Sequence, residues 1–89
     1  MHDEDANAGP RLRIAVFAGM AELAGCRQID LPWRGGTVAE LRRGLADAHP
    51  AVASLLARSA VAVGGRYAGD DDPVAAGADV AVIPPVSGG

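Results

Sequence analysis

The segment Asp79-Val80-Ala81-Val82-Ile83-Pro84-Pro85-Val86-Ser87-Gly88-Gly89 joins an apolar strand pattern to a pair of prolines and a pair of glycines. In the expected strand, Val80 and Val82 share one phase and Ile83 takes the opposite one. The strand has to stop at Pro84, because proline has no N–H for a sheet ladder and holds its own φ fixed. This segment therefore predicts a last strand that runs directly into a C-terminal tail.

The tail, residues 84–89, has the composition of a peptide that enters a narrow site. Gly88 and Gly89 have no Cβ, so they can adopt extended or positive-φ geometry in a channel too narrow for a side chain. An ordinary frayed end is the alternative reading. The stiff Pro84-Pro85 spacer argues against it, since a merely disordered end gains nothing from being aimed. We expect the tail to insert into the active site of another protein.

Upstream of this segment, period-2 alternation predicts further strands. Over residues 11–18 the apolar phase faces the core, whereas Phe17 lies in the phase that should face water. Residues 26–31 predict a second strand, which pairs with the first as a hairpin and in which Cys26 serves as a small apolar residue. Shorter strands are expected at 61–63 and 66–68. The core positions of the first two strands are Leu12, Ile14, Val16, Ile29 and Leu31.

One main helix is predicted by a capping box, Thr37-Val38-Ala39-Glu40, in which threonine and glutamate satisfy each other's backbone N–H groups. The helix begins at Val38 and ends at His49-Pro50. Its inward positions are Val38, Leu41, Leu45 and Ala48, and its solvent face carries Arg42, Arg43 and Asp47. Two shorter helical segments are expected: one at 20–24, with Met20, Leu23 and Ala24 inward and Gly25 as its terminator, and one at 51–58, with Val52, Leu55 and Leu56 inward.

The order of these elements favours an α+β fold of the β-grasp (ubiquitin-like) type. Short connections and right-handed crossovers place the first and last strands adjacent and parallel at the centre of a mixed sheet, with the main helix across one face. We expect a disordered acidic leader at 1–10, the β-grasp domain at 11–83 and a flexible tail at 84–89. Off the core face, Phe17 and Ile83, with Tyr67 nearby, are expected to form an apolar patch beside the tail.

Composition narrows the classes of function. The chain has eight basic residues, all of them arginine, and eleven acidic ones, for a net charge of −3. The arginines form no stripe along the sequence, which argues against nucleic acid as a partner. The single Cys26 excludes an internal disulfide and favours a reducing, cytoplasmic setting. No secretory signal or membrane-spanning run is apparent. The run 70–72 of consecutive aspartates lacks the alternating spacing of a metal loop, so no metal site is expected.

Three segments resemble the MoaD/ThiS sulfur-carrier family. They are Phe17-Ala18-x-x-x-Glu22-Leu23-x-Gly25, Thr37-Val38-x-x-Leu41 and the run from Gly77 to Gly89. The resemblance covers residues 11–89, and its most specific part is the final Pro-Pro-Val-Ser-Gly-Gly. It is greatest to the small subunit of molybdopterin synthase, because thiamine-pathway carriers are typically shorter and lack the first segment. Gly64-Gly65 replaces the asparagine-containing turn that these carriers often have.

The resemblance implies a carrier whose reactive group is the α-carboxylate of Gly89, next to Gly88. An E1-like adenylyltransferase would activate this carboxylate with ATP, and a sulfur donor would convert it to a thiocarboxylate. The loaded tail would then give its sulfur to a cyclic pyranopterin in the large subunit of molybdopterin synthase, which holds the catalytic groups. The carrier itself would bind no cofactor. Its partner-binding residues would be Phe17, Tyr67 and Ile83 on the surface and Pro84, Pro85, Val86 and Ser87 in the tail.

Three other functions are compatible with the same sequence. The carrier chemistry could serve the synthesis of cysteine, thiamine or a secondary metabolite. The chain could be a ubiquitin-like modifier whose activated Gly89 is joined to lysines of other proteins. It could also be a plain interaction domain with an inert tail.

Overall fold

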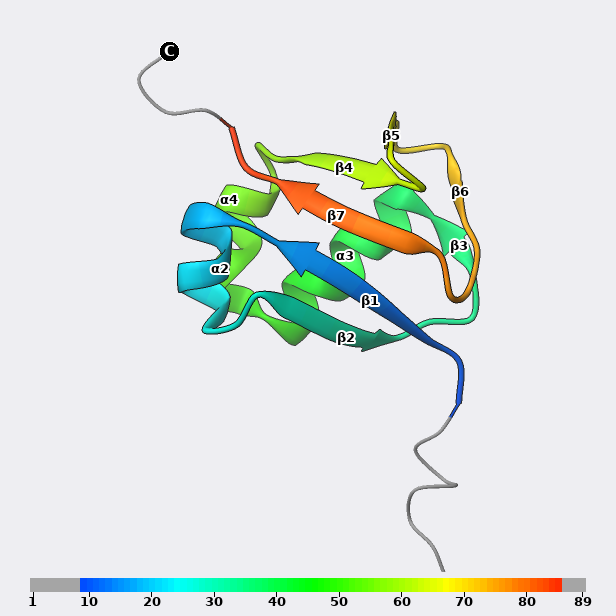
Figure 1. The fold of residues 1–89 in the computed structure, drawn as a ribbon, viewed down its shortest axis with the longest axis horizontal. Coiled ribbons are helices and arrows are strands. Elements are labelled where there is room, and N and C mark those ends of the chain that lie inside the picture. The colour runs from blue at the N-terminus through cyan, green and yellow to red at the C-terminus, as the bar shows by residue number, and fades with distance from the viewer. Residues whose placement is uncertain (1–8, 86–89) are drawn as a thin grey trace, which may run out of the picture.

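A computed structural model describes residues 9–85 of the 89-residue chain. A five-stranded sheet of order β2-β1-β7-β4-β5 carries the helices on one face, and β3 and β6 form a small second sheet (Figure 1). The elements in chain order are β1 (Arg11–Val16), α2 (Ala18–Ala24), β2 (Gln28–Pro32), β3 (Gly36–Thr37), α3 (Val38–Ala48), the 3₁₀ turn η1 (Pro50–Val52), α4 (Ala53–Leu56), β4 (Ala60–Val63), β5 (Arg66–Ala68), β6 (Pro73–Val74) and β7 (Asp79–Ile83).

The two strands furthest apart in sequence lie side by side in the sheet. β1 runs parallel to β7, with partners from Arg13–Asp79 to Val16–Val82. β2 and β4 complete the centre as antiparallel neighbours of β1 and β7. The expected β-grasp fold, with parallel first and last strands and a main helix packed across the sheet, is confirmed.

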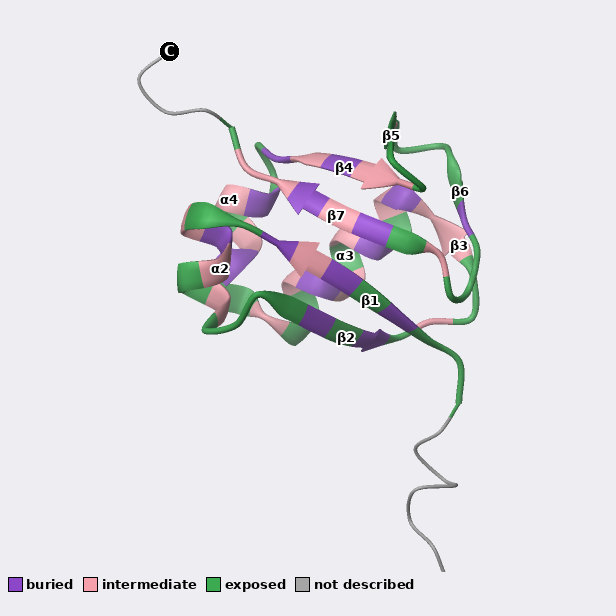
Figure 2. Cartoon of the chain, in the orientation of Figure 1, coloured by how far each residue is buried: buried purple, intermediate pink, exposed green. Residues whose placement is uncertain are grey.

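The core lies between one face of the sheet and the helices (Figure 2). Alternation along β1 and β7 buries every second side chain, so that the core residues of these two strands are the ones that the sequence pattern predicts. Burying a valine, leucine or isoleucine side chain fully contributes about 1.5–3 kcal/mol to the stability of the fold. The side chains with at most 2% exposure are Leu12, Ile14, Val16, Met20, Val38, Leu41, Leu45, Val52, Leu56, Val61, Val74 and Val82.

The capping box at the start of α3 forms as predicted. The Thr37 hydroxyl accepts a hydrogen bond from the Glu40 N–H at 3.2 Å, and Glu40 Oε1 accepts one from the Thr37 N–H at 2.8 Å. The backbone donor stabilises the charged carboxylate and so lowers the pKa of Glu40. Two orphan N–H groups at the helix start are thereby satisfied, which fixes where α3 begins.

Three residues that were predicted to face the core, or to serve as a small apolar residue, are exposed instead, so these predictions are wrong. Leu23 is 49% exposed, because the buried stripe of α2 runs through Met20, Ala21 and Ala24, and at about 100° per residue Leu23 falls outside that stripe. Ala48, in the last turn of α3, is exposed. Cys26 is also exposed, since it lies in the turn after Gly25 and the strand begins only at Gln28.

Arg42 was expected on the solvent face, and this too is wrong. Its side chain is only 24% exposed and crosses from α3 to the end of α4. Nη1 donates to the Leu56 carbonyl at 2.7 Å and Nη2 to the Ser59 carbonyl at 2.8 Å. Nε lies 3.3 Å from an Asp70 carboxylate oxygen without a hydrogen bond of good geometry to any described group, so that contact is electrostatic. Arg42 therefore ties α3 to the turn that enters β4.

Replacing Arg42 with alanine is expected to lower the free energy of unfolding by about 1.5–3 kcal/mol, because two carbonyls lose a charged donor. Asp70→Ala is the matched control: that side chain is 67% exposed, so its loss should cost less than about 1 kcal/mol. Urea unfolding followed by circular dichroism measures both variants. Equal losses would show that the ion pair, not the two hydrogen bonds, gives Arg42 its role.

Candidate functional site

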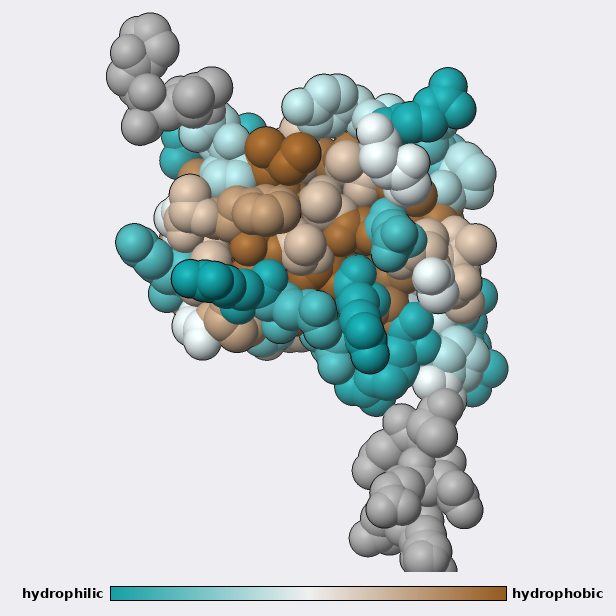
Figure 3. Space-filling view, viewed as in Figure 1, coloured by the Kyte–Doolittle hydropathy of each residue, from teal (hydrophilic) through white to brown (hydrophobic). Residues whose placement is uncertain are grey.

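The face of the sheet opposite the helices is uncovered; it is mostly apolar over β7 and β4 and hydrophilic over β2 and the start of β1 (Figure 3). Across its middle, the register aligns Ala15 on β1, Ala81 on β7, Ala62 on β4 and Tyr67 on β5. The three alanines are half-buried. The three alanines were not among the predicted site residues, although their strand phase, opposite to the core, marks them as outward.

Phe17 and Ile83 lie together at one end of this face. Val16 and Val82 are partners in the β1–β7 ladder, so the next residue of each strand leaves the sheet on the same side. Phe17 is extended, with φ −134° and ψ 158°, and 50% exposed. Ala18, at φ 50°, then turns the chain away into α2. Ile83 is half-buried, and its partner on β4 is Ala60.

Tyr67 lies at a different place on the same face. It is 76% exposed on the edge strand β5, opposite Ala62, and both β4 and β7 separate it from β1. The expected patch of Phe17, Ile83 and Tyr67 is thus wider than predicted, and the alanines connect its two ends. We define the apolar face as Ala15, Phe17, Ala60, Ala62, Tyr67, Ala81 and Ile83.

The apolar face is shallow instead of deeply hollowed. A recess near its centre has a volume of about 220 Å³ and is lined by Ala15, Ala62, Gly65, Asp79, Val80 and Ala81. A recess with small, mostly apolar walls and no cluster of reactive groups suits contact with another protein better than turnover of a small substrate. Within residues 9–85, no three histidine, cysteine or acidic side chains group as a metal site would require.

The C-terminal segment leaves the sheet beside this face. β7 is the central strand and ends at Ile83, directly before Pro84 and Pro85, of which the first is half-buried and the second exposed. The chain exits at the end of the sheet where Phe17 stands (Figure 1). The other predicted tail residues, Val86, Ser87, Gly88 and Gly89, lie outside the described residues.

Fold and site together define a class: a ubiquitin-like β-grasp protein whose last, central strand leads its C-terminal segment out beside an exposed apolar face. The ThiS family model matches residues 14–89, and the chain therefore belongs to the ThiS family; its fold is that of the MoaD/ThiS-type sulfur carriers and small modifiers. The resemblance noted in the sequence is confirmed. No curated protein sequence matches the chain.

Solved structures of similar proteins agree with this assignment. The crystal structure of small archaeal modifier protein 1 (SAMP1) from Haloferax volcanii superposes with a TM-score of 0.79 at 32% identity, covering 89% of this chain and 99% of that one. The structure of a putative molybdopterin converting factor subunit 1 from Pyrococcus furiosus superposes with a TM-score of 0.76 at 25% identity, covering 88% of this chain and 100% of that one. A chain of the Helicobacter pylori complex of molybdopterin-converting factor subunits 1 and 2 shares the fold alone, with a TM-score of 0.63 at 19% identity, covering 89% of this chain and 99% of that one.

The longest helix among residues 9–85 is α3, and none in that range has the length and apolar content needed to cross a membrane.

Proposed function

We propose that this chain is the sulfur carrier of molybdopterin synthase, with the Gly89 carboxylate as its reactive group. The observation that carries the proposal is the exit of the central strand β7 into Pro84-Pro85, beside the apolar face. A docked partner would cover the face, and the last residues would reach into its active site. The Pyrococcus furiosus structure, named as a molybdopterin converting factor subunit, supports the choice of pathway.

The chemistry starts from a carboxylate, which is inert until one oxygen becomes a good leaving group. An E1-like adenylyltransferase would join Gly89 to AMP, using ATP and releasing pyrophosphate. A sulfur donor would then displace AMP, leaving a C-terminal thiocarboxylate. In the large subunit of molybdopterin synthase this sulfur would attack a pyranopterin carbon, and hydrolysis would return the carboxylate. ATP is consumed by the activating enzyme, and we assign no cofactor to the carrier.

In this scheme the carrier contributes positioning instead of an acid or base. The large subunit provides the catalytic groups, and the apolar face holds the reactive end in its active site. The complex of subunits 1 and 2 known for the Helicobacter pylori protein is the kind of assembly that we propose.

The proposal is tested by the intact mass of a Cys26→Ser variant, in which the one exposed thiol is removed. The variant is incubated with the E1-like enzyme of the same organism, ATP and sulfide. We expect a mass gain equal to the replacement of one oxygen by sulfur, strictly dependent on ATP. No gain, with an enzyme that activates another carrier, would overturn the proposal. Transfer of the sulfur to pyranopterin by the large subunit then tests the pathway.

A second function, that of a protein modifier, is favoured by the 32% identity with small archaeal modifier protein 1. The two functions differ in their products. A modifier forms conjugates in which lysines of other proteins are joined to Gly89, and these appear as bands of higher mass in a lysate. A carrier accumulates the thiocarboxylate and forms no such bands.

A further inference from the structure

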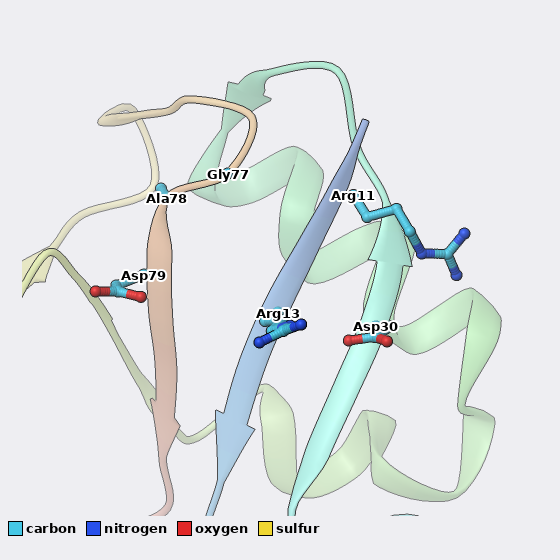
Figure 4. A pocket seen from close by; sticks show the side chains of 6 residues that line it. All are labelled: Arg11, Arg13, Asp30, Gly77, Ala78 and Asp79. Carbon is cyan, nitrogen blue, oxygen red and sulfur yellow. The ribbon is translucent and has the colours of Figure 1, made fainter. Parts of the chain in front are cut away.

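A row of alternating charge crosses the uncovered face of the sheet at the end away from Phe17. Arg13 on β1 has Asp30 of β2 as its partner on one side and Asp79 of β7 on the other. All three side chains are exposed, and Arg13 lies between the two aspartates on the same side of the sheet (Figure 4). We name Asp30, Arg13 and Asp79 the charged row.

The charged row makes the uncovered face different at its two ends. Along β1 the side chains in this phase are Arg11, Arg13, Ala15 and then Phe17, so at ~3.3 Å per residue Arg13 lies about 13 Å from the end where β7 exits. Beside the row, a recess of about 390 Å³ is lined by its three residues together with Arg11, Gly77 and Ala78. Along β1 and β7 the face therefore changes from charged, at Arg13 and Asp79, to apolar at the end where β7 exits.

An apolar face alone does not tell a partner which way to dock. Shape and apolar contact would allow the sheet to bind in two directions related by a half-turn, and in one of them the exiting chain points away from the partner's active site. In that reversed direction the charged row would be pressed against the apolar surface that should receive Phe17. Burying charges without partners is costly, so the reversed complex is selected against.

We propose that the charged row fixes the direction in which the apolar face docks, and so delivers the tail to the partner's channel. The inference rests on the proposed function, with the large subunit as the partner. That partner would present apolar surface beside its channel and, farther away, an acidic group opposite Arg13 flanked by basic groups opposite Asp30 and Asp79. As pairs across strands the row adds only about 0.2–1 kcal/mol each to the sheet. Its larger effect is on the orientation of the complex.

The test uses Cys26, the only cysteine, as the place for a nitroxide spin label. Cys26 precedes β2 at the end of the sheet where Phe17 lies, so the label reports where that end sits on the partner. The labelled full-length chain is bound to the isotope-labelled large subunit from the same organism, and broadening of the partner's NMR signals is mapped. When the charged row is native, the label should broaden the NMR signals of a single set of positions on the large subunit.

The neutral variant Asp30→Asn/Arg13→Gln/Asp79→Asn should broaden two separate sets, because both directions become populated, with up to about half of the complexes reversed. Its Kd should change less than about threefold, since charges at an interface rim add little affinity. A row of opposite sign, Asp30→Arg/Arg13→Asp/Asp79→Arg, keeps the pairing within the sheet and should also lose the single direction. Arg58→Gln, at an exposed position outside the face, is the control.

The outcomes separate this inference from the proposed function. If the native chain does not bind the large subunit, the proposed function fails. If it binds and both row variants still broaden one set of positions, the charged row does not decide direction and the inference is wrong. A single direction with a Kd raised more than about tenfold would make the row an ordinary affinity contact and would equally overturn the inference.

Discussion

Deleting Gly89 is expected to abolish thiocarboxylate formation while leaving the fold intact. The β-grasp elements end at Ile83, so no strand or core contact of the described structure depends on the last residue. The chemistry depends on it completely, because an activating enzyme must bring one particular carboxylate to the phosphate of ATP. In the shortened chain the terminal carboxylate belongs to Gly88 and lies one residue short of that point. Small displacements of a reacting atom lower reaction rates by orders of magnitude.

Gly88→Val tests the same end without changing its length. A β-branched side chain should block a channel that admits only glycine, so we expect at least a 100-fold loss in the rate of sulfur loading, with the same unfolding midpoint as the parent. Removing residues 1–8 is the matched control at the other end of the chain and should have no effect. Normal loading of the chain without Gly89 would show that the reactive group lies elsewhere.

Phe17→Asp is expected to weaken binding to the large subunit by 30-fold to 1,000-fold, equivalent to about 2–4 kcal/mol for an aromatic residue that is buried by the partner. Phe17 is half exposed, it stands next to Ile83, and it marks the end of the apolar face from which β7 exits. A docked partner would desolvate its ring, whereas an aspartate there would have to be buried without a partner charge.

Leu23→Asp is the matched control for Phe17→Asp. Leu23 is 49% exposed against 50% for Phe17, but it lies on α2 and outside the apolar face. The two substitutions should therefore have similar small effects on unfolding and very different effects on Kd, measured by isothermal titration calorimetry. Equal losses of affinity would mean that exposed apolar area in general, and not the apolar face, drives binding. Tyr67→Asp should fall between the two if contact extends to the edge strand.

Local features of the chain were predictable in detail because short-range geometry determines them. The alternation of Leu12, Ile14 and Val16 requires only that a strand faces one core. The capping box of Thr37 and Glu40 closes within four residues, and Gly25, at φ 76°, ends α2 as a left-handed cap. The errors at Leu23 and Ala48 arose where a helix is short or ending, so that periodicity leaves the buried stripe undefined.

The role of Arg42 could not be predicted from the helix pattern. Its position on α3 indicates only that the side chain points away from the sheet. Whether it meets water or the carbonyls of Leu56 and Ser59 depends on how α4 returns beneath α3, and that return is set by the burial of Val52 and Leu56. A charged side chain with an apolar stem can serve in either place.

By itself, the sequence determined the five strands of the main sheet, the main helix, the β-grasp arrangement and the end of the last strand at Pro84, since these follow from periodicity, capping and the missing proline N–H. It did not predict the short strands β3 and β6 of the second sheet. Only the tertiary structure decided how the uncovered face is composed. Ala15, Ala62 and Ala81 become one surface, and Arg13 comes to lie between Asp30 and Asp79, through the register of strands that are distant in sequence. The physical reason is that strand phase tells which side a residue faces, whereas the hydrogen-bonded ladder decides which residues are its neighbours.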